Sequence, residues 1–133
     1  MNPFYPLVAE RAAHRCEYCR APEEIFNYIF EVEHIHPEAH GGALAAANLA
    51  LACRACNLFK SDFLTGFDDL TQQFVRLFHP RTDRWEDHFT VDLESLEIVG
   101  LTEVGRATVT RLRMNQPYSL VARAHWMRFG LFP

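Results

Sequence analysis

The sequence predicts an α+β fold whose N-terminal half is held together by a metal ion. All four cysteines fall in two Cys-x-x-Cys pairs, Cys16/Cys19 and Cys53/Cys56. A gap of two residues lets both thiolates of a pair bind one tetrahedral zinc ion, so the two pairs together complete its ligand shell. Between the pairs, a stretch rich in aromatic and β-branched residues precedes a loop and then a stretch that suits a helix. The predicted order in this half is therefore strand, loop, helix.

Each element of the N-terminal half has its own local signal. Apolar residues after Pro6 recur at helical spacing, and the loop contains Pro37 and the pair Gly41-Gly42, which interrupt regular structure. The segment after the loop has leucines and alanines but no Gly or Pro, which favours a helix, or at least a turn followed by one. The expected elements are a helix at 7–15, a strand at 26–35, a loop at 36–47 and a helix at 48–60.

The C-terminal half carries separate signals. An amphipathic stretch predicts a helix, and two short β-branched stretches around a turn predict a pair of strands. Thr102 can cap the helix that follows, Pro117 can open the last helix and Gly130 can end it. The expected elements are a helix at 67–78, strands at 89–92 and 98–101, and helices at 103–114 and 117–129.

Disulfide bonds are the alternative use for four cysteines. Frameworks of that kind occur mostly in short secreted chains, whereas the segment Met1–Pro6 has neither the basic nor the apolar region of a secretion signal. No later apolar run approaches the length of a membrane span. We therefore expect reduced cysteines around a structural zinc ion, no membrane partner and a cytoplasmic location.

Composition indicates one ordinary globular unit with an uneven charge. The chain has 133 residues and a formal net charge of -4, which argues against a nonspecific nucleic-acid coat protein because such binding depends on many cations. Residues 62–103 nevertheless hold three basic and ten acidic residues, and residues 104–133 hold five arginines and no acid. The tail arginines, including Arg106 and Arg113, either extend a nucleic-acid footprint or pair with the acidic stretch. We expect pairing.

A set of short motifs surrounds the second half of the predicted strand. They are Glu33-His34-Ile35-His36-Pro37, Gly41-Gly42, Asn48-Leu49 and Cys56-Asn57-Leu58-Phe59-Lys60. Together with the cysteine pairs, over roughly residues 5–65, this pattern resembles the HNH endonuclease family. The resemblance implies a ββα-metal core, also called a His-Me finger, at residues 1–66. Residues 67–133 are then a mixed α/β extension that packs on the core or forms the face of a homodimer.

The resemblance also implies a function and a role for each motif residue. The function is metal-dependent hydrolysis of DNA phosphodiester bonds, by nicking or by cutting duplex DNA. Glu33, which stands where many relatives carry Asp, and Asn57 would be ligands of a catalytic divalent ion, and His34 would be the general base. Asn48 would fix the loop that carries the histidine. The four cysteines would hold a separate, structural zinc ion.

Elementary chemistry supports these residue types independently. A neutral imidazole with a pKa near ~6.5 can deprotonate water close to neutral pH. A hard ion such as Mg²⁺ can neutralise the negative charge of a phosphoryl transition state, and one carboxylate with one amide oxygen leaves its remaining positions open. Four thiolates close the shell around zinc and leave no position for a substrate. The structural ion and the catalytic ion are therefore expected to be different ions at different places.

Several assignments have a simpler alternative. Lys60, Arg54 and Arg20 are candidates to contact DNA phosphates, since Lys60 would lie on the same side of a helix as Asn57. His36 either assists metal or phosphate binding or is a loop histidine satisfied by hydrogen bonds. The whole segment, finally, is either a nuclease or a noncatalytic zinc module that binds nucleic acid or a protein partner.

Overall fold

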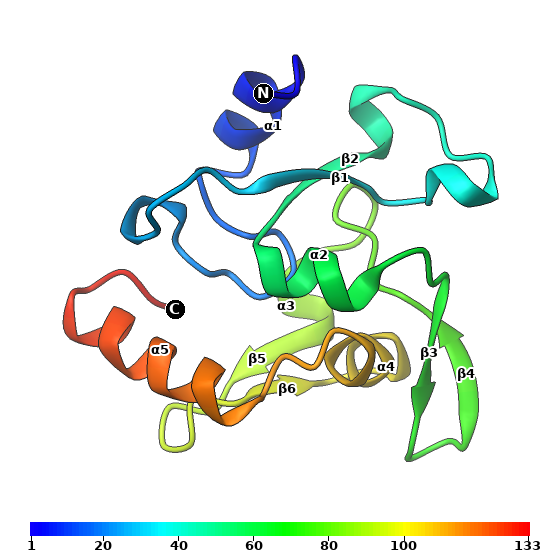
Figure 1. Cartoon of the computed structure of the whole chain (residues 1–133). Coiled ribbons are helices and arrows are strands. Elements are labelled where there is room, and N and C mark those ends of the chain that lie inside the picture. Colours follow the sequence, from blue (N-terminus) through cyan, green and yellow to red (C-terminus); the bar gives the residue numbers. More distant parts are fainter.

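The structure, a computed structural model, describes all 133 residues and consists of five α-helices and three small antiparallel sheets. In the N-terminal half, helix α1 lies above a two-stranded sheet and helix α2 lies below it (Figure 1). The elements of this half are α1 (Tyr5–Arg11), β1 (Glu31–His34), β2 (Leu49–Ala52) and α2 (Arg54–Lys60), with single 3₁₀ turns at Glu23–Ile25, Glu38–His40 and Ala46–Asn48.

Strands β1 and β2 form an antiparallel pair that carries the motif residues at one end. Glu33 lies opposite Ala50, and His34 lies opposite Leu49. The expected strand at 26–35 is confirmed but shorter, and the expected loop at 36–47 contains two 3₁₀ turns. The helix expected at 48–60 is wrong in its first part, because β2 precedes α2. Its apolar sequence fits a helix locally, but all four residues are buried and their backbone groups pair with β1, and this tertiary context overrides propensity.

Helix α2 begins at a cysteine that serves as its cap. The sulfur of Cys53 accepts a hydrogen bond from the backbone N–H of Cys56, and the helix ends at Lys60 where Ser61 adopts a φ of 48°. The sequence of strand, loop, strand and helix therefore brings β1, the loop and the end of α2 to one place.

The first sheet of the C-terminal half replaces the helix expected at 67–78. Strands β3 (Thr65–Asp68) and β4 (Gln73–Arg76) form a hairpin. Asp68 stabilises its turn by accepting hydrogen bonds from the backbone N–H groups of Leu70 and Thr71, a local alternative to helix that aspartate favours. Leu70 and Phe74, which would lie on the apolar face of such a helix, are 74% and 69% exposed. The apolar residues at helical spacing in this segment therefore do not form one buried face.

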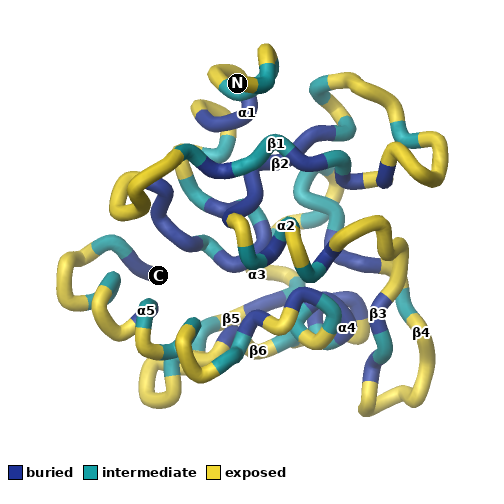
Figure 2. The backbone as a smooth tube through the Cα atoms, in the orientation of Figure 1, coloured by how far each residue is buried: buried dark blue, intermediate teal, exposed yellow.

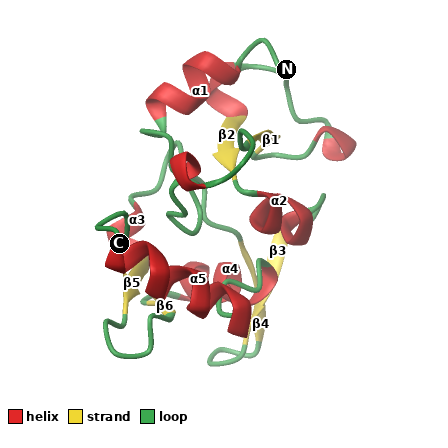
Figure 3. Ribbon diagram, turned by 60° about the vertical axis from the view of Figure 1, so that its left-hand side comes forward, coloured by secondary structure: helices red, strands yellow, loops and turns green.

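The other C-terminal predictions are confirmed in type. The elements are α3 (Trp85–His88), β5 (Phe89–Val91), β6 (Ile98–Gly100), α4 (Glu103–Arg111) and α5 (Pro117–Arg128). The Thr102 side chain caps α4 by accepting from the N–H of Gly105, and α4 ends three residues earlier than expected. Gly130, with a φ of 71°, follows the end of α5. Figures 1 and 3 show that α4 and α5 both lie below α2.

One hydrophobic core joins the two halves of the chain. Its 21 buried residues come from residues 8–56 on one side and from residues 77–114 on the other. Figure 2 shows buried backbone in β2 and in α4. Trp85 and Trp126 are partly buried against this core. The division of the chain near residue 66 stays a prediction. None of the helices combines the length and the apolar character that crossing a membrane requires.

Candidate functional site

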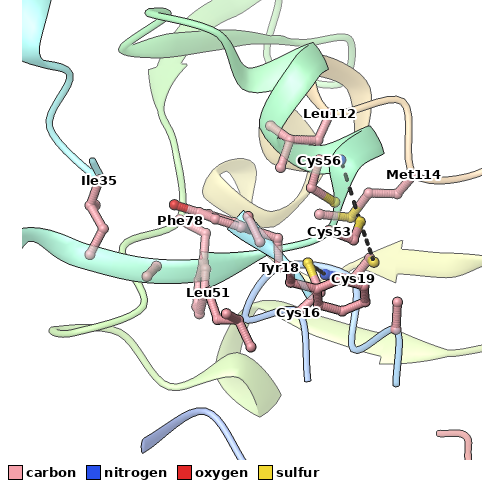
Figure 4. Packing of buried hydrophobic residues seen from close by; sticks show 14 of the residues in the cluster. Cys16, Tyr18, Cys19, Ile35, Leu51, Cys53, Cys56, Phe78, Leu112 and Met114 are labelled. Atoms are coloured by element: carbon pink, nitrogen blue, oxygen red, sulfur yellow. Dashed lines mark hydrogen bonds between the residues drawn. The ribbon is translucent and has the colours of Figure 1, made fainter. Parts of the chain in front are cut away.

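The four cysteines form a compact, buried cluster. Their sulfur atoms lie within 4.8 Å of one another, and Figure 4 shows them gathered between α2 and the loop that follows α1. Each pair has the same local geometry, because the second cysteine donates its backbone N–H to the sulfur of the first at 3.5 Å, in Cys16/Cys19 and in Cys53/Cys56. No disulfide links them.

The spacing of the sulfurs fits a tetrahedral zinc ion. With a Zn–S bond of ~2.3 Å, two sulfurs of a tetrahedron lie roughly 3.8 Å apart, and the sulfurs of Cys19 and Cys53 are 3.7 Å apart. Burial of all four side chains leaves no open position for a substrate. The cluster can therefore hold a structural zinc ion, as predicted.

A second site lies where β1, the loop and the end of α2 meet. It is a shallow cleft with a volume of about 430 Å³. Three of the predicted residues, Glu33, His34 and Asn57, line it together with Glu38 and Asp62. The strand delivers the first two as neighbours and the helix returns the third. No group of three or more His, Cys, Asp or Glu side chains other than the cysteines lies close enough to hold a metal ion.

Asn48 pins the loop between His36 and Ala43. Its side-chain oxygen accepts from the N–H of His36 at 2.8 Å, and its amide nitrogen donates to the carbonyls of His36 and Ala43 at 3.0 and 2.9 Å. Gly42 is required by the same closure, because a Cβ there would lie 1.8 Å from the carbonyl oxygen of His36. Asn48 therefore fixes the loop that begins two residues after His34.

Glu33 is turned into the protein and is fully partnered. It is 5% exposed, with one carboxylate oxygen accepting from the hydroxyl of Tyr18 and the other from Lys60 Nζ at 3.0 Å. Tyr18 lies inside the first cysteine pair and is completely buried. A continuous network therefore connects the zinc-site loop, β1 and the end of α2.

Burial and neighbouring charges shift the pKa values of this network. Burial raises the pKa of Glu33 above its usual value, although the attraction of Lys60 and the hydrogen bond from Tyr18 act in the opposite direction. Burial and the neighbouring Glu33 carboxylate hold the pKa of Tyr18 well above its usual value, so its hydroxyl remains the donor.

Lys60 does not reach the surface. It is 1% exposed, and besides Glu33 it donates to the carbonyl oxygens of His34 and Ile35 at 3.1 and 2.9 Å. The predicted contact between Lys60 and a DNA phosphate is therefore wrong, because all three protons of the ammonium are used inside the protein. Instead it fixes the end of the strand that carries His34.

The remaining predicted residues lie at the surface with partners of their own. Asn57 donates its amide to Glu31, which also pairs with Arg54 at 3.0 Å. Arg20 pairs with Glu86 at 3.1 Å and stacks over the ring of Trp85. The phosphate contacts expected for Arg54 and Arg20 stay predictions. The exposed His36 ring hydrogen-bonds the carbonyl of His40 at 3.0 Å, as expected for a loop histidine.

Two residues of the site escaped the sequence predictions. Tyr18 is one, and its position between Cys16 and Cys19 was the available signal. The other is Glu31, which lies two residues before Glu33 and therefore on the same face of the strand. The contacts that give Tyr18 and Glu31 a role at the site become apparent only when their partners on other elements are known.

The C-terminal arginines pair with the acidic stretch at one position. Arg106 forms two hydrogen bonds with Asp68, at 2.8 and 3.1 Å, and this confirms the expected pairing there. Arg111 and Arg113 stack instead over the rings of Phe63 and Phe59. Arg113 lies beyond the end of α4, so it does not share a helix face with Arg106.

A comparison with protein families decides the family of the N-terminal half. The family model described as HNH endonuclease matches residues 16–63. This segment is an HNH domain. The match includes both cysteine pairs, the β1–β2 sheet and α2, and an HNH domain indicates a nuclease-type or zinc-binding function. Searches of curated proteins and of solved structures found no match for the chain.

Proposed function

We propose that the protein is a metal-dependent HNH endonuclease that hydrolyses phosphodiester bonds of DNA. The observation that carries the proposal is the cleft that His34, Glu33 and Asn57 line together, within the segment that matches the family. The β1–β2 sheet with α2 would then be the ββα-metal core.

His34 would act as the general base. Its place on the cleft wall lets its imidazole take a proton from the water that attacks phosphorus, while the P–O bond to the 3′ oxygen breaks. Family resemblance implies products with a 5′-phosphate and a 3′-hydroxyl. Lys60 and Asn48 would position His34, since Lys60 binds its carbonyl oxygen and Asn48 binds the backbone N–H of His36.

A divalent ion such as Mg²⁺ would supply charge neutralisation for the pentacovalent transition state. Glu33 and Asn57 fit it as ligands in number and type, because each carboxylate oxygen keeps a second lone pair and the Asn57 oxygen is not needed for the contact with Glu31. The partnership with Lys60 reduces the negative charge that Glu33 offers. Since affinity for such ions depends on ligand charge, we expect weak, millimolar-type binding.

Cleavage of supercoiled plasmid tests the proposal. The zinc-loaded protein is assayed first without an added divalent ion and then with Mg²⁺ or Mn²⁺. The ion is omitted rather than chelated, because a chelator would also remove the structural zinc. Cleavage should depend on the added ion. His34→Ala should lower the rate by roughly 10²–10⁴, the usual contribution of a general base, with unchanged unfolding and zinc content.

The matched control is His125→Ala, which removes an exposed histidine of α5 and should cleave like the wild type. Wild-type cleavage by His34→Ala would remove the assigned base. Absence of ion-dependent cleavage of both duplex and single-stranded DNA would refute the proposed endonuclease activity.

One observation favours the alternative, a noncatalytic zinc module. Both oxygens of Glu33 already have protein partners, and the carboxylate is buried. A module of this kind would bind nucleic acid or a protein with no dependence on Mg²⁺ or His34. Binding of DNA by a folded protein that never cleaves it would establish this reading.

A further inference from the structure

Arg123 is a buried cation with neutral partners. It lies on α5 and is only 2% exposed. Its guanidinium donates to the carbonyl of Leu96 at 3.1 Å, to the side-chain oxygen of Asn115 at 3.0 Å and to the carbonyl of Met114. Its Nε is buried without a hydrogen-bond partner. Every acceptor that it meets is thus a dipole rather than a charge.

A guanidinium in this position needs a counter-charge. Each ion pair of the protein joins a basic side chain to a carboxylate, and Arg123 belongs to none of these pairs. Removing a cation from water without an anion nearby is strongly unfavourable. Hydrogen bonds to neutral groups recover only part of that free energy. Negative charge from a group other than a carboxylate would therefore stabilise Arg123.

The cysteine cluster is the anionic group beside it. Arg123 lines one cavity, with a volume of about 410 Å³, together with Cys19, Cys53 and Cys56. Four thiolates around one Zn²⁺ carry a formal charge of minus two. Burial lowers the pKa of Arg123, while the negative charge of the cysteines opposes this effect.

We propose that Arg123 is a positioning residue of the zinc site, whose buried positive charge stabilises the anionic zinc–cysteine cluster from the C-terminal helix. The cation offsets part of the repulsion among four thiolates and so raises zinc affinity. In return, the cluster supplies the counter-charge that keeps α5 docked. The HNH domain is then incomplete without a side chain 60 residues beyond its end. This inference depends on zinc alone and holds whether or not the protein is a nuclease.

Zinc affinity of charge-matched variants tests the proposal. Arg123→Lys keeps the charge and loses most hydrogen bonds, whereas Arg123→Met keeps the apolar stem of the side chain and loses the charge. Arg128→Met is the control, because Arg128 is an exposed arginine on the same helix. Zinc-loaded proteins are titrated with a chromophoric chelator, and unfolding curves are measured in parallel.

Arg123→Met should bind zinc roughly 10- to 100-fold more weakly, the usual effect of losing a partner next to a metal site. Arg123→Lys and Arg128→Met should stay close to wild type in zinc affinity, even if the lysine variant unfolds more easily. Equal zinc affinity of the lysine and methionine variants would overturn the proposal, since hydrogen bonding alone would then explain the residue.

A second variant decides the matter if Arg123→Met does not fold. Asn115→Asp places an anion on Arg123 without removing it, at a position where Asn115 already accepts from the guanidinium. The new carboxylate competes with the cysteines for the cation, so zinc affinity should fall while Arg123 keeps its contacts. Unchanged zinc affinity in Asn115→Asp would refute a charge-based role.

Discussion

Replacing Lys60 by methionine should destabilise the protein far more than the loss of an ordinary ion pair. Its ammonium lies 3.0 Å from a carboxylate oxygen of Glu33, and both residues are buried. Methionine has a similar length but leaves the carboxylate without a counter-charge and two carbonyls without a donor. Breaking a buried pair from one side costs about 3–5 kcal/mol. For a chain of this size, the loss corresponds to a fall in melting temperature of about 10–20 °C.

The loss should also depend on pH in a defined direction. In the wild type, burial already raises the pKa of Glu33, and Lys60 is the main opposing influence. Without Lys60, the pKa of Glu33 in the folded state rises further above its unfolded value of ~4.3. A protonated carboxyl needs no counter-charge, so the variant is least affected near the unfolded pKa. Its deficit should grow by up to about 1.4 kcal/mol per pH unit as pH rises toward the folded pKa.

Urea unfolding of zinc-loaded wild type and Lys60→Met at about pH 5 and about pH 8 measures both effects. Arg54→Met is the matched control. It breaks the exposed pair with Glu31 and should cost no more than about 1 kcal/mol, with little change between the two pH values. A deficit below about 1 kcal/mol for Lys60→Met, or one that is the same at both pH values, would refute the assigned role.

Two further predictions concern the zinc site and the C-terminal extension. Cys53→Ser should release zinc and lower the melting temperature sharply, because zinc binding is coupled to folding. Metal analysis and thermal unfolding measure these two effects. Folded wild-type protein that contains no zinc would contradict the prediction. Arg106 holds the pKa of Asp68 in the folded protein well below its usual value of ~3.9. The ion pair therefore stabilises the fold at pH values above ~3.9, and this stabilisation is lost as pH falls toward the folded-state pKa of Asp68. The stability difference between wild type and Arg106→Gln should therefore shrink as pH falls below ~3.9, and a difference that does not shrink would contradict the pairing.

Local sequence patterns were sufficient for the features that depend on neighbours in the chain. The two-residue gap in each cysteine pair sets how two thiolates approach one ion, and the structure brings all four sulfurs together. Thr102 and Pro117 mark the starts of α4 and α5 because helix caps act over only a few residues. The three site residues that line one cleft, by contrast, followed from the resemblance to a family and not from a local pattern.

Features that depend on distant partners were decided by the tertiary structure alone. Residues 49–52 and 67–78 have helix-compatible sequences, and only pairing with β1 and the hairpin turn at Asp68 made strands of them. The direction of Lys60 followed from a buried carboxylate and two carbonyls at the end of β1. Its spacing from Asn57 equally suited a contact with a phosphate at the surface. A charge has no local preference strong enough to choose between water and the interior. That choice depends on which counter-charges and acceptors the folded chain brings within a few ångströms, as it does for Lys60 and Arg123.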